Sequence, residues 1–174
     1  MPLDPWSYAE KTGKEHAHQA ALFMWANMAC RFGVEIANDV KSYTVAGYAN
    51  EALHAIHSGE GYDPAVKQLK WLHAIHNQGF DAGVAGKIRG GHAKAEGVKA
   101  GVADMFLPVP MPKAIFDPPS YHGLYIELKI GKNKPDAKQL EFIEDMRAAG
   151  YRAEWVIGWE AARLLILDYL QLPS

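Results

Sequence analysis

The sequence predicts a domain of the α/β or α+β class, in which helices flank a mixed β-sheet. A chain of 174 residues, 49% of them hydrophobic, is long enough to bury one substantial core. Stretches of helical periodicity and apolar runs of strand length follow one another in the order helix, strand, strand, strand, helix, strand, helix. This order is typical of a sheet with helices packed on it. We therefore expect a single domain over residues 1–174, with an N-terminal helical part at about 14–60 and a core at about 69–170.

The N-terminal part is expected to contain two helices. Residues 15–32 carry a broad apolar face, with Gly13 just before them and Gly33 just after them. A second helical stretch is expected at about 45–56, and residues 59–66, which include two glycines and a proline, are expected to form a loop.

The C-terminal part is expected to contain the sheet and two more helices. Pro135 suits the first turn of a helix that continues to about Ala149, and residues 160–170 form a closing amphipathic helix. Residues 82–95, rich in Ala and Gly, are expected to be a weak helix or a structured loop. Four apolar runs are the expected strands: 69–75, 102–109, 123–130 and 152–157.

Composition and charge exclude several classes of protein. The single cysteine, Cys30, cannot form an internal disulfide and lies in an apolar helical stretch, which suggests core packing. The N-terminus lacks a basic region followed by an apolar run, and no apolar run is long enough to span a bilayer. We therefore expect an intracellular, cytoplasmic protein with no membrane partner. The net charge of −2 does not indicate a nucleic-acid-binding protein, although it can conceal a local basic patch.

The residues that point to chemistry are Asp104 and the tripeptide Glu127-Leu128-Lys129. Side chains alternate along a strand, so Glu127 and Lys129 face one side of the sheet together. An apolar strand of this kind is expected to be central, where burial of either charge alone would cost several kcal/mol. If Asp104 comes from a neighbouring strand, the three charges form a cluster. The alternative is that Glu127 and Lys129 form a surface pair on an edge strand.

Two carboxylates with nearby carbonyl oxygens form a hard-oxygen site, which suits Mg²⁺ or Mn²⁺. The positive charge of the ion removes the repulsion between the acids. Such an ion can hold a scissile phosphate and lower the pKa of a bound water, so this site suits a hydrolase without a covalent nucleophile. A zinc site is not favoured, because no cysteine pairs accompany the histidines.

Three segments together resemble the VRR-NUC family, the virus-type replication-repair nucleases of the PD-(D/E)XK superfamily. They are Lys94–Pro108, Gly123–Lys129, and Gln139–Ile143 with Gly150-Tyr151. The resemblance covers roughly residues 14–170, and the joint spacing is much more specific than any one segment. It implies a restriction-endonuclease-like mixed sheet flanked by helices, with residues 69–170 as the catalytic core.

The resemblance also implies roles for individual residues. Asp104 and Glu127 resemble the metal-binding acids, and Lys129 resembles the catalytic lysine. Gln139 is similar to a glutamine near the phosphate, and Glu15 is similar to a helical acid that completes or supports the metal site. The expected metal ligands are thus the carboxylates of Asp104 and Glu127 and the backbone carbonyl of Leu128, with Glu15 as a further candidate.

The chain departs from the family pattern at two places. Ala103 precedes Asp104 where relatives often carry a proline, which changes backbone stiffness but not ligand chemistry. His76 replaces the proline of a Pro-Asn-Gly-Gly loop, so a role for Asn77 is only a weak expectation.

Basic residues gather around these motifs with few acids among them, which predicts a surface that binds the DNA backbone. The alternative is a set of solvated charges without a partner. The candidates before and after the acids are Lys87, Arg89, His92, Lys94, Lys99, Lys132, Lys134 and Lys138.

The expected function is that of an endonuclease acting on DNA with Mg²⁺ or Mn²⁺. Small relatives resemble homodimeric junction resolvases, which implies a homodimer that cuts four-way (Holliday) junctions or other branched DNA, with residues 34–66 as candidate dimer contacts. Relatives are frequent in phage genomes, which implies phage replication, recombination or repair. The alternatives are a flap-directed, end-directed or nicking nuclease, a non-catalytic DNA-binding protein with a nuclease fold, and a hydrolase with an unrelated ligand.

Overall fold

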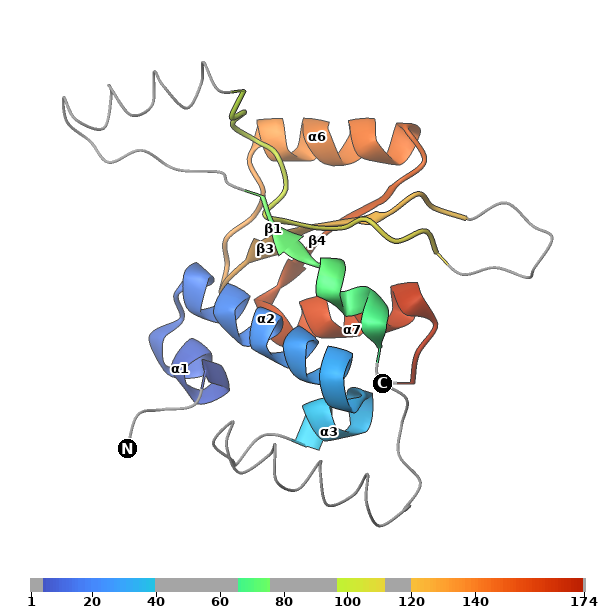
Figure 1. The fold of residues 1–174 in the computed structure, drawn as a ribbon. Helices are drawn as coiled ribbons and strands as arrows, with labels where there is room; N and C mark the ends of the chain where they lie inside the picture. The colour runs from blue at the N-terminus through green and yellow to red at the C-terminus, as the bar shows by residue number, and fades with distance from the viewer. Residues whose placement is uncertain (1–4, 40–65, 76–96, 112–119, 174) are drawn as a thin grey trace, which may run out of the picture.

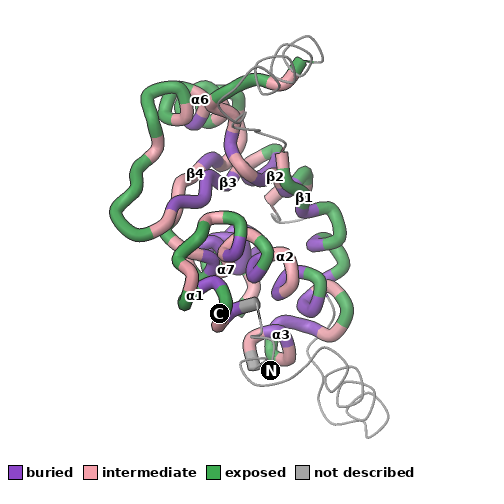
Figure 2. The backbone as a smooth tube through the Cα atoms, turned by 90° about the vertical axis from the view of Figure 1, so that its left-hand side faces the viewer, coloured by how far each residue is buried: buried purple, intermediate pink, exposed green. Residues whose placement is uncertain are grey.

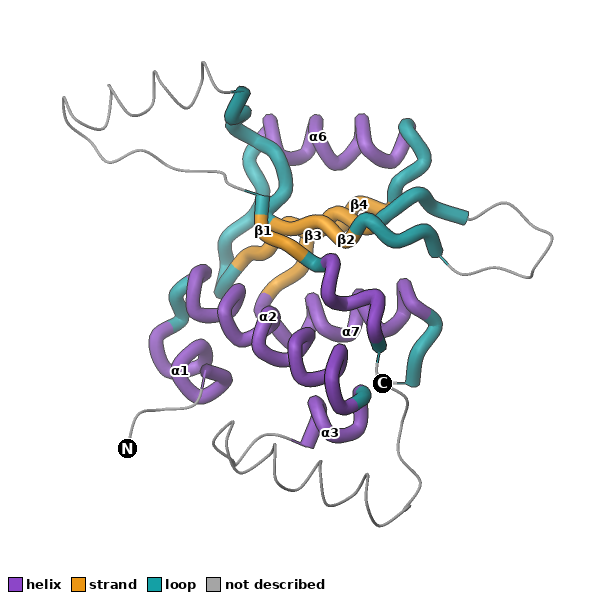
Figure 3. The backbone as a smooth tube through the Cα atoms, viewed as in Figure 1, coloured by secondary structure: helices purple, strands orange, loops and turns teal. Residues whose placement is uncertain are grey.

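The computed structural model describes residues 5–39, 66–75, 97–111 and 120–173 and arranges them in three layers (Figure 1). The sheet forms the middle layer, with helix α6 on one face and helices α2 and α7 on the other (Figures 1 and 3). The elements are α1 Pro5–Thr12, α2 Glu15–Phe32, α3 Val34–Asp39, the 3-10 helix η1 Lys67–Trp71, β1 His73–Ala74, β2 Met105–Leu107, β3 Leu124–Lys129, α6 Ala137–Ala148, β4 Arg152–Ile157 and α7 Gly158–Leu170.

The four strands of the described chain form one sheet in the order β1-β2-β3-β4. The pairs β1–β2 and β2–β3 are antiparallel, and β3–β4 is parallel. The sheet is therefore mixed and flanked by helices, which confirms the predicted fold class. Strand β3 lies inside the sheet, between β2 and β4, as its apolar sequence predicted.

Strand β3 divides its side chains between two environments. Leu124, Ile126 and Leu128 have no exposed surface and belong to the main core with residues of α2 and α7. The alternating residues face α6, where the ring of Tyr125 packs edge-on against Phe142 with ring centroids 5.2 Å apart. Buried residues therefore gather between the sheet and the helices below it, as Figure 2 shows.

Helix α2 crosses the middle of this core because small and large apolar side chains line one of its faces. Trp25 and Leu22 are fully buried there. The indole nitrogen of Trp25 donates to the Asn38 side-chain oxygen at 3.0 Å, and the guanidinium of Arg163 donates to the same oxygen at 2.8 Å. This shared acceptor joins α2, α3 and α7 by satisfied polar contacts.

Several predicted elements are confirmed. The helix over 15–32 and the strand over 152–157 have the predicted bounds, and the predicted strand 123–130 is β3 without its end residues. The single-domain prediction is not tested by these observations. The predictions for 45–56 and 82–95 lie outside the described residues, and so does all of the predicted 59–66 loop except Val66.

The predicted strand over 69–75 is wrong in its first half. Lys67–Trp71 forms a 3-10 helix, and only His73–Ala74 is a strand. The reason is that Leu69 and Leu72 both reach the core, and a spacing of three residues places side chains on one side of a 3-10 helix.

Other predicted boundaries were wrong by a few residues. The strand expected over 102–109 pairs only over Met105–Leu107, since the next residue, Pro108, has no N–H to donate to a neighbouring strand. Helix α6 begins after Asp136, so Pro135 precedes the helix and does not sit in its first turn. Helix α7 begins at Gly158, before the predicted 160, and helices α1 and α3 were not predicted. Among the described helices, none combines the length and the apolar character that a bilayer crossing requires.

The position of the core can be tested on two leucines of one helix. Leu167 is 1% exposed and Leu164 is 46% exposed, three residues apart on α7. We expect Leu167→Ala to lower the free energy of unfolding by roughly 2–5 kcal/mol, because it leaves a cavity. Leu164→Ala is the matched control and should change it by about 0.5 kcal/mol or less. Urea denaturation measures both, and equal losses would contradict the placement of α7.

Candidate active site

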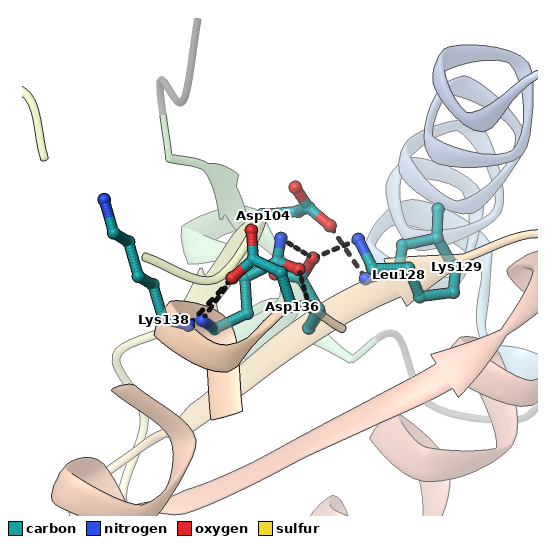
Figure 4. A network of polar contacts seen from close by, with 7 residues as sticks. Asp104, Leu128, Lys129, Asp136 and Lys138 are labelled. Carbon is teal, nitrogen blue, oxygen red and sulfur yellow. Dashed lines mark hydrogen bonds and ion pairs between the residues drawn. The ribbon is translucent and has the colours of Figure 1, made fainter. Parts of the chain in front are cut away.

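Asp104 is placed at the end of β3 by the pairing of its own strand. It directly precedes β2, in which Met105 lies opposite Ile126, so that Asp104 comes opposite Glu127. One oxygen of its carboxylate accepts a hydrogen bond from the Leu128 backbone N–H at 2.8 Å (Figure 4). Its own backbone carbonyl accepts from the N–H of Ile75 at 2.7 Å. Asp104 is therefore held by β3 through its side chain and by Ile75, the residue after β1, through its backbone.

Glu127 and Lys129 lie in the interior of the protein. Glu127 has no exposed surface and Lys129 is 8% exposed, on the strand between β2 and β4. The Lys129 ammonium group donates to Glu127 Oε1. The alternative of a surface pair on an edge strand is therefore wrong.

Gln139 reaches Glu127 from the first turn of α6. Its side-chain nitrogen donates to Glu127 Oε1, the oxygen that also accepts from Lys129. The other oxygen, Oε2, is buried and has no hydrogen-bond partner in the described part of the chain. A buried carboxylate oxygen without a partner is costly, and such an oxygen in a native site calls for a ligand.

Glu15 stands beside this group, at the first residue of α2. It is half-buried and close enough to Lys129 and Asp104 to feel both charges. No three side chains among the described His, Cys, Asp and Glu residues lie where they could share a metal ion. In this arrangement Glu15 flanks the two acids and does not complete a three-acid ligand set. The structure thus brings together all five residues predicted as catalytic: Glu15, Asp104, Glu127, Lys129 and Gln139.

Burial disfavours the charged forms of the acids of the site. Burial raises the pKa of Glu127 from 4.5 to about 7, although the hydrogen bond from Lys129 acts against it and the charge of Asp104 adds to it. Burial also raises the pKa of Asp104, against the effects of the Leu128 N–H and Lys129. The pKa of Glu15 is raised by its burial as well.

Lys129 remains a cation. Burial acts to lower the pKa of Lys129, but the hydrogen bond from Lys129 to Glu127 and the charges of Glu127, Glu15 and Asp104 together outweigh it, so the pKa is raised. One ammonium group thus faces three acids. It cannot neutralise all three when they are ionised, so an additional cation would stabilise their charged forms.

The donor atoms fit a hard divalent cation. Carboxylates of Asp104 and Glu127 would supply two oxygens, one of them the unpartnered Glu127 Oε2. The N–H and C=O of one strand residue point to the same side, so the Leu128 carbonyl faces Asp104 as its N–H does. Mg²⁺ is commonly held by one or two carboxylates and keeps several waters, which this set allows.

Exposed lysines lie in the segments next to the site in the sequence, before Asp104 and after Lys129 as far as the first turn of α6. Lys99, Lys132, Lys134 and Lys138 are exposed. Figure 4 shows the Lys138 side chain pointing away from Lys129, at the start of α6. The other predicted DNA contacts, Lys87, Arg89, His92 and Lys94, lie outside the described residues, and so does Asn77.

Sequence reasoning missed Asp136, the N-cap of the helix that carries Gln139. It accepts hydrogen bonds from the N–H groups of Lys138 and Gln139 at 2.9 and 3.0 Å, and Gln139 accepts from its N–H at 3.0 Å. This is a capping box, and its signal, Asp-x-x-Gln at the start of a helix, is legible in the sequence.

Comparison with known proteins bears on the fold. No protein-family model and no curated protein matches the sequence. Among solved structures, this chain is similar to one described as "VRR_NUC domain protein", with a TM-score of 0.52 and 21% identity. The match covers 92% of this chain and 91% of that chain. The chain has the fold that its motifs predicted.

The pH dependence of stability tests the burial of Glu127. A raised pKa means that this group stabilises the fold fully below pH 4.5 and that the stabilisation is lost as the pH rises through about 7. For metal-free protein in EDTA, we expect Glu127→Gln to reduce the loss of stability between pH 5 and pH 8, by on the order of 3 kcal/mol at most. Urea denaturation at both pH values measures it. Identical pH dependence in the two proteins would contradict the burial.

Gly101 tests the packing of the Asp104 loop on α6. Its φ is +88°, and a Cβ there would lie 2.6 Å from Lys138 Cβ. Gly97 has a φ of +90° with nothing within 4 Å, so Gly97→Ala is a matched control for backbone strain alone. We expect Gly101→Ala to lower the free energy of unfolding by at least about 1 kcal/mol more than Gly97→Ala. Equal losses in thermal denaturation would show that this loop does not pack on α6.

Proposed function

We propose that this protein is a metal-dependent nuclease that hydrolyses phosphodiester bonds in DNA. The observation that carries the proposal is the buried carboxylate of Glu127, which has one unpartnered oxygen beside Asp104 and Lys129. Buried acids around one ammonium group suit a site that takes up a cation. The VRR_NUC fold supports the same chemistry.

Each residue of the site has a proposed role in the reaction. Asp104, Glu127 and the Leu128 carbonyl would hold Mg²⁺ or Mn²⁺. When bound, the ion supplies Lewis acidity to the scissile phosphate and lowers the pKa of a bound water. Lys129 remains charged beside Glu127, where its ammonium group can orient the attacking water or stabilise negative charge on the phosphate. Glu15 supports the site by its negative charge.

Substrate binding is assigned to the lysines around the site. Lys99, Lys132, Lys134 and Lys138 are exposed and able to contact phosphates. Lys87, Arg89 and Lys94 are proposed for the same surface on the strength of the sequence. The formal charge of −2 for the whole chain does not oppose this, because binding depends on the local field.

We propose branched DNA, such as a four-way junction, as the preferred substrate, cut by a homodimer. Two sites related by a two-fold axis could cut paired strands symmetrically. The support is the resemblance of the sequence to junction-resolving relatives. Flap-directed, end-directed and nicking activities are the alternatives that a substrate panel separates.

The proposal is tested by cleavage of a four-way junction. We expect cleavage with Mg²⁺ or Mn²⁺, none in EDTA, and a loss of kcat of at least about 10²-fold in Asp104→Ala and Lys129→Ala, since each removes a group at the reacting phosphate. Lys132→Ala is the control. It should weaken DNA binding and reduce the slope of log affinity against log salt concentration by about one. We expect kcat to stay nearly unchanged.

The outcomes separate the alternatives. Equal cleavage of junctions, flaps, nicked duplexes and single-stranded ends would remove the junction preference. DNA binding without cleavage by the wild type, unchanged in Asp104→Ala, would identify a binding protein with a nuclease fold.

A further inference from the structure

The side chain of Gln139 is held at both ends. Its oxygen accepts from the Asp136 backbone N–H at 3.0 Å, as the third residue of α6 in a capping box. Its nitrogen donates to Glu127 Oε1. The first contact determines the second, because an amide whose oxygen faces the N-cap must turn its NH₂ group the other way.

The cap that fixes this amide is complete. Asp136 accepts from the N–H groups of Lys138 and Gln139, which satisfies two donors at the start of the helix. The Asp136 carboxylate is thus engaged with the helix start (Figure 4). Gly101 packs against Lys138, which lies in the first turn of α6. The start of α6 therefore contacts the loop that leads to Asp104.

The consequence for Glu127 is a defined orientation. Oε1 receives two donors, from Gln139 and Lys129, whereas Oε2 receives none in the described residues and is buried. Fixing a glutamate side chain costs conformational entropy. A glutamate that the protein already holds in place loses less of this entropy when it binds a cation. The two donors hold one oxygen so that the other stays free for the cation.

We infer that Gln139 is a positioning residue for the metal ligand Glu127, held by the backbone N–H of Asp136, and is not a contact to the substrate phosphate. The oxygen and one N–H of its amide are already engaged within the protein. This inference rests on the proposed metal-dependent activity. The group that orients Gln139 is the backbone N–H of Asp136, whereas the Asp136 side chain stabilises the start of the helix.

Two variants separate the site from the helix end. Gln139→Met keeps the length and helix propensity of the side chain and removes both the donor to Glu127 and the acceptor for the Asp136 N–H. Asp136→Ala removes the side-chain cap but keeps the backbone N–H that orients Gln139. Titration calorimetry with MnCl₂ gives the Kd for Mn²⁺ without any need for cleavage, and junction cleavage gives kcat and KM.

We expect Gln139→Met to weaken Mn²⁺ binding by about 10–100-fold, as is common when a hydrogen bond to a metal ligand is lost. kcat at a fixed, non-saturating Mn²⁺ concentration should fall with it, while KM for DNA stays within about 3-fold, because the side chain acts on the ion site and not on DNA. Asp136→Ala should lower Tm through the lost cap and leave the Kd for Mn²⁺ within about 3-fold of wild type.

Three results would overturn this inference and leave the proposed function standing. They are an unchanged Kd for Mn²⁺ in Gln139→Met, a raised KM for DNA with unchanged Mn²⁺ binding in the same variant, or a loss of Mn²⁺ affinity in Asp136→Ala equal to that in Gln139→Met. A wild-type protein that neither binds Mn²⁺ nor cleaves DNA would overturn the proposed function and this inference with it. Mn²⁺ binding by the wild type without cleavage, weakened in Gln139→Met, would support the positioning role and count against the nuclease.

Discussion

The carboxyl group of Glu127 lies without solvent contact on the middle of a sheet, where an isolated charge is costly. Lys129 offsets part of this cost, but Asp104 brings a second acid to the same place. One lysine cannot balance both, and burial therefore keeps the pKa of Glu127 near 7. A divalent cation removes the imbalance directly, because it favours the charged form of each acid. The proposed role of a cation thus rests on burial as much as on the identity of the residues.

Strand β3 contributes side chains to both the hydrophobic core and the candidate site. Ile126 and Leu128 pack beneath the sheet against helices α2 and α7, while Glu127 and Lys129 face α6. Helix α2 also contributes to both, with Trp25 in the core and Glu15 at the site. The groups that would hold a cation are therefore carried on the most deeply packed elements, which limits their movement.

The sequence predicted most of what depends on alternation and periodicity. The two faces of Glu127-Leu128-Lys129 and the helix over 15–32 are legible as local patterns, whereas the nearness of Asp104 was expected from the family resemblance. It could not predict features that tertiary contacts decide. Leu69 and Leu72 fit a strand or a 3-10 helix equally, and only the core surface selects between them. The approach of Gly101 to Lys138 joins segments far apart in the sequence and has no local signal.

The position of the capping box follows from the topology. Strands β3 and β4 are parallel neighbours joined through α6, so the chain leaves the C-terminal end of β3 and must begin α6 near that end. The acid and lysine of the site stand at the same end, and residues 130–136 provide a short connection between them and the helix. The first turn of α6 therefore comes within side-chain reach of Glu127. In this arrangement the third residue of the helix, Gln139, is placed to serve both the helix start and the acid, and a single amide joins the stability of α6 to the geometry of the site.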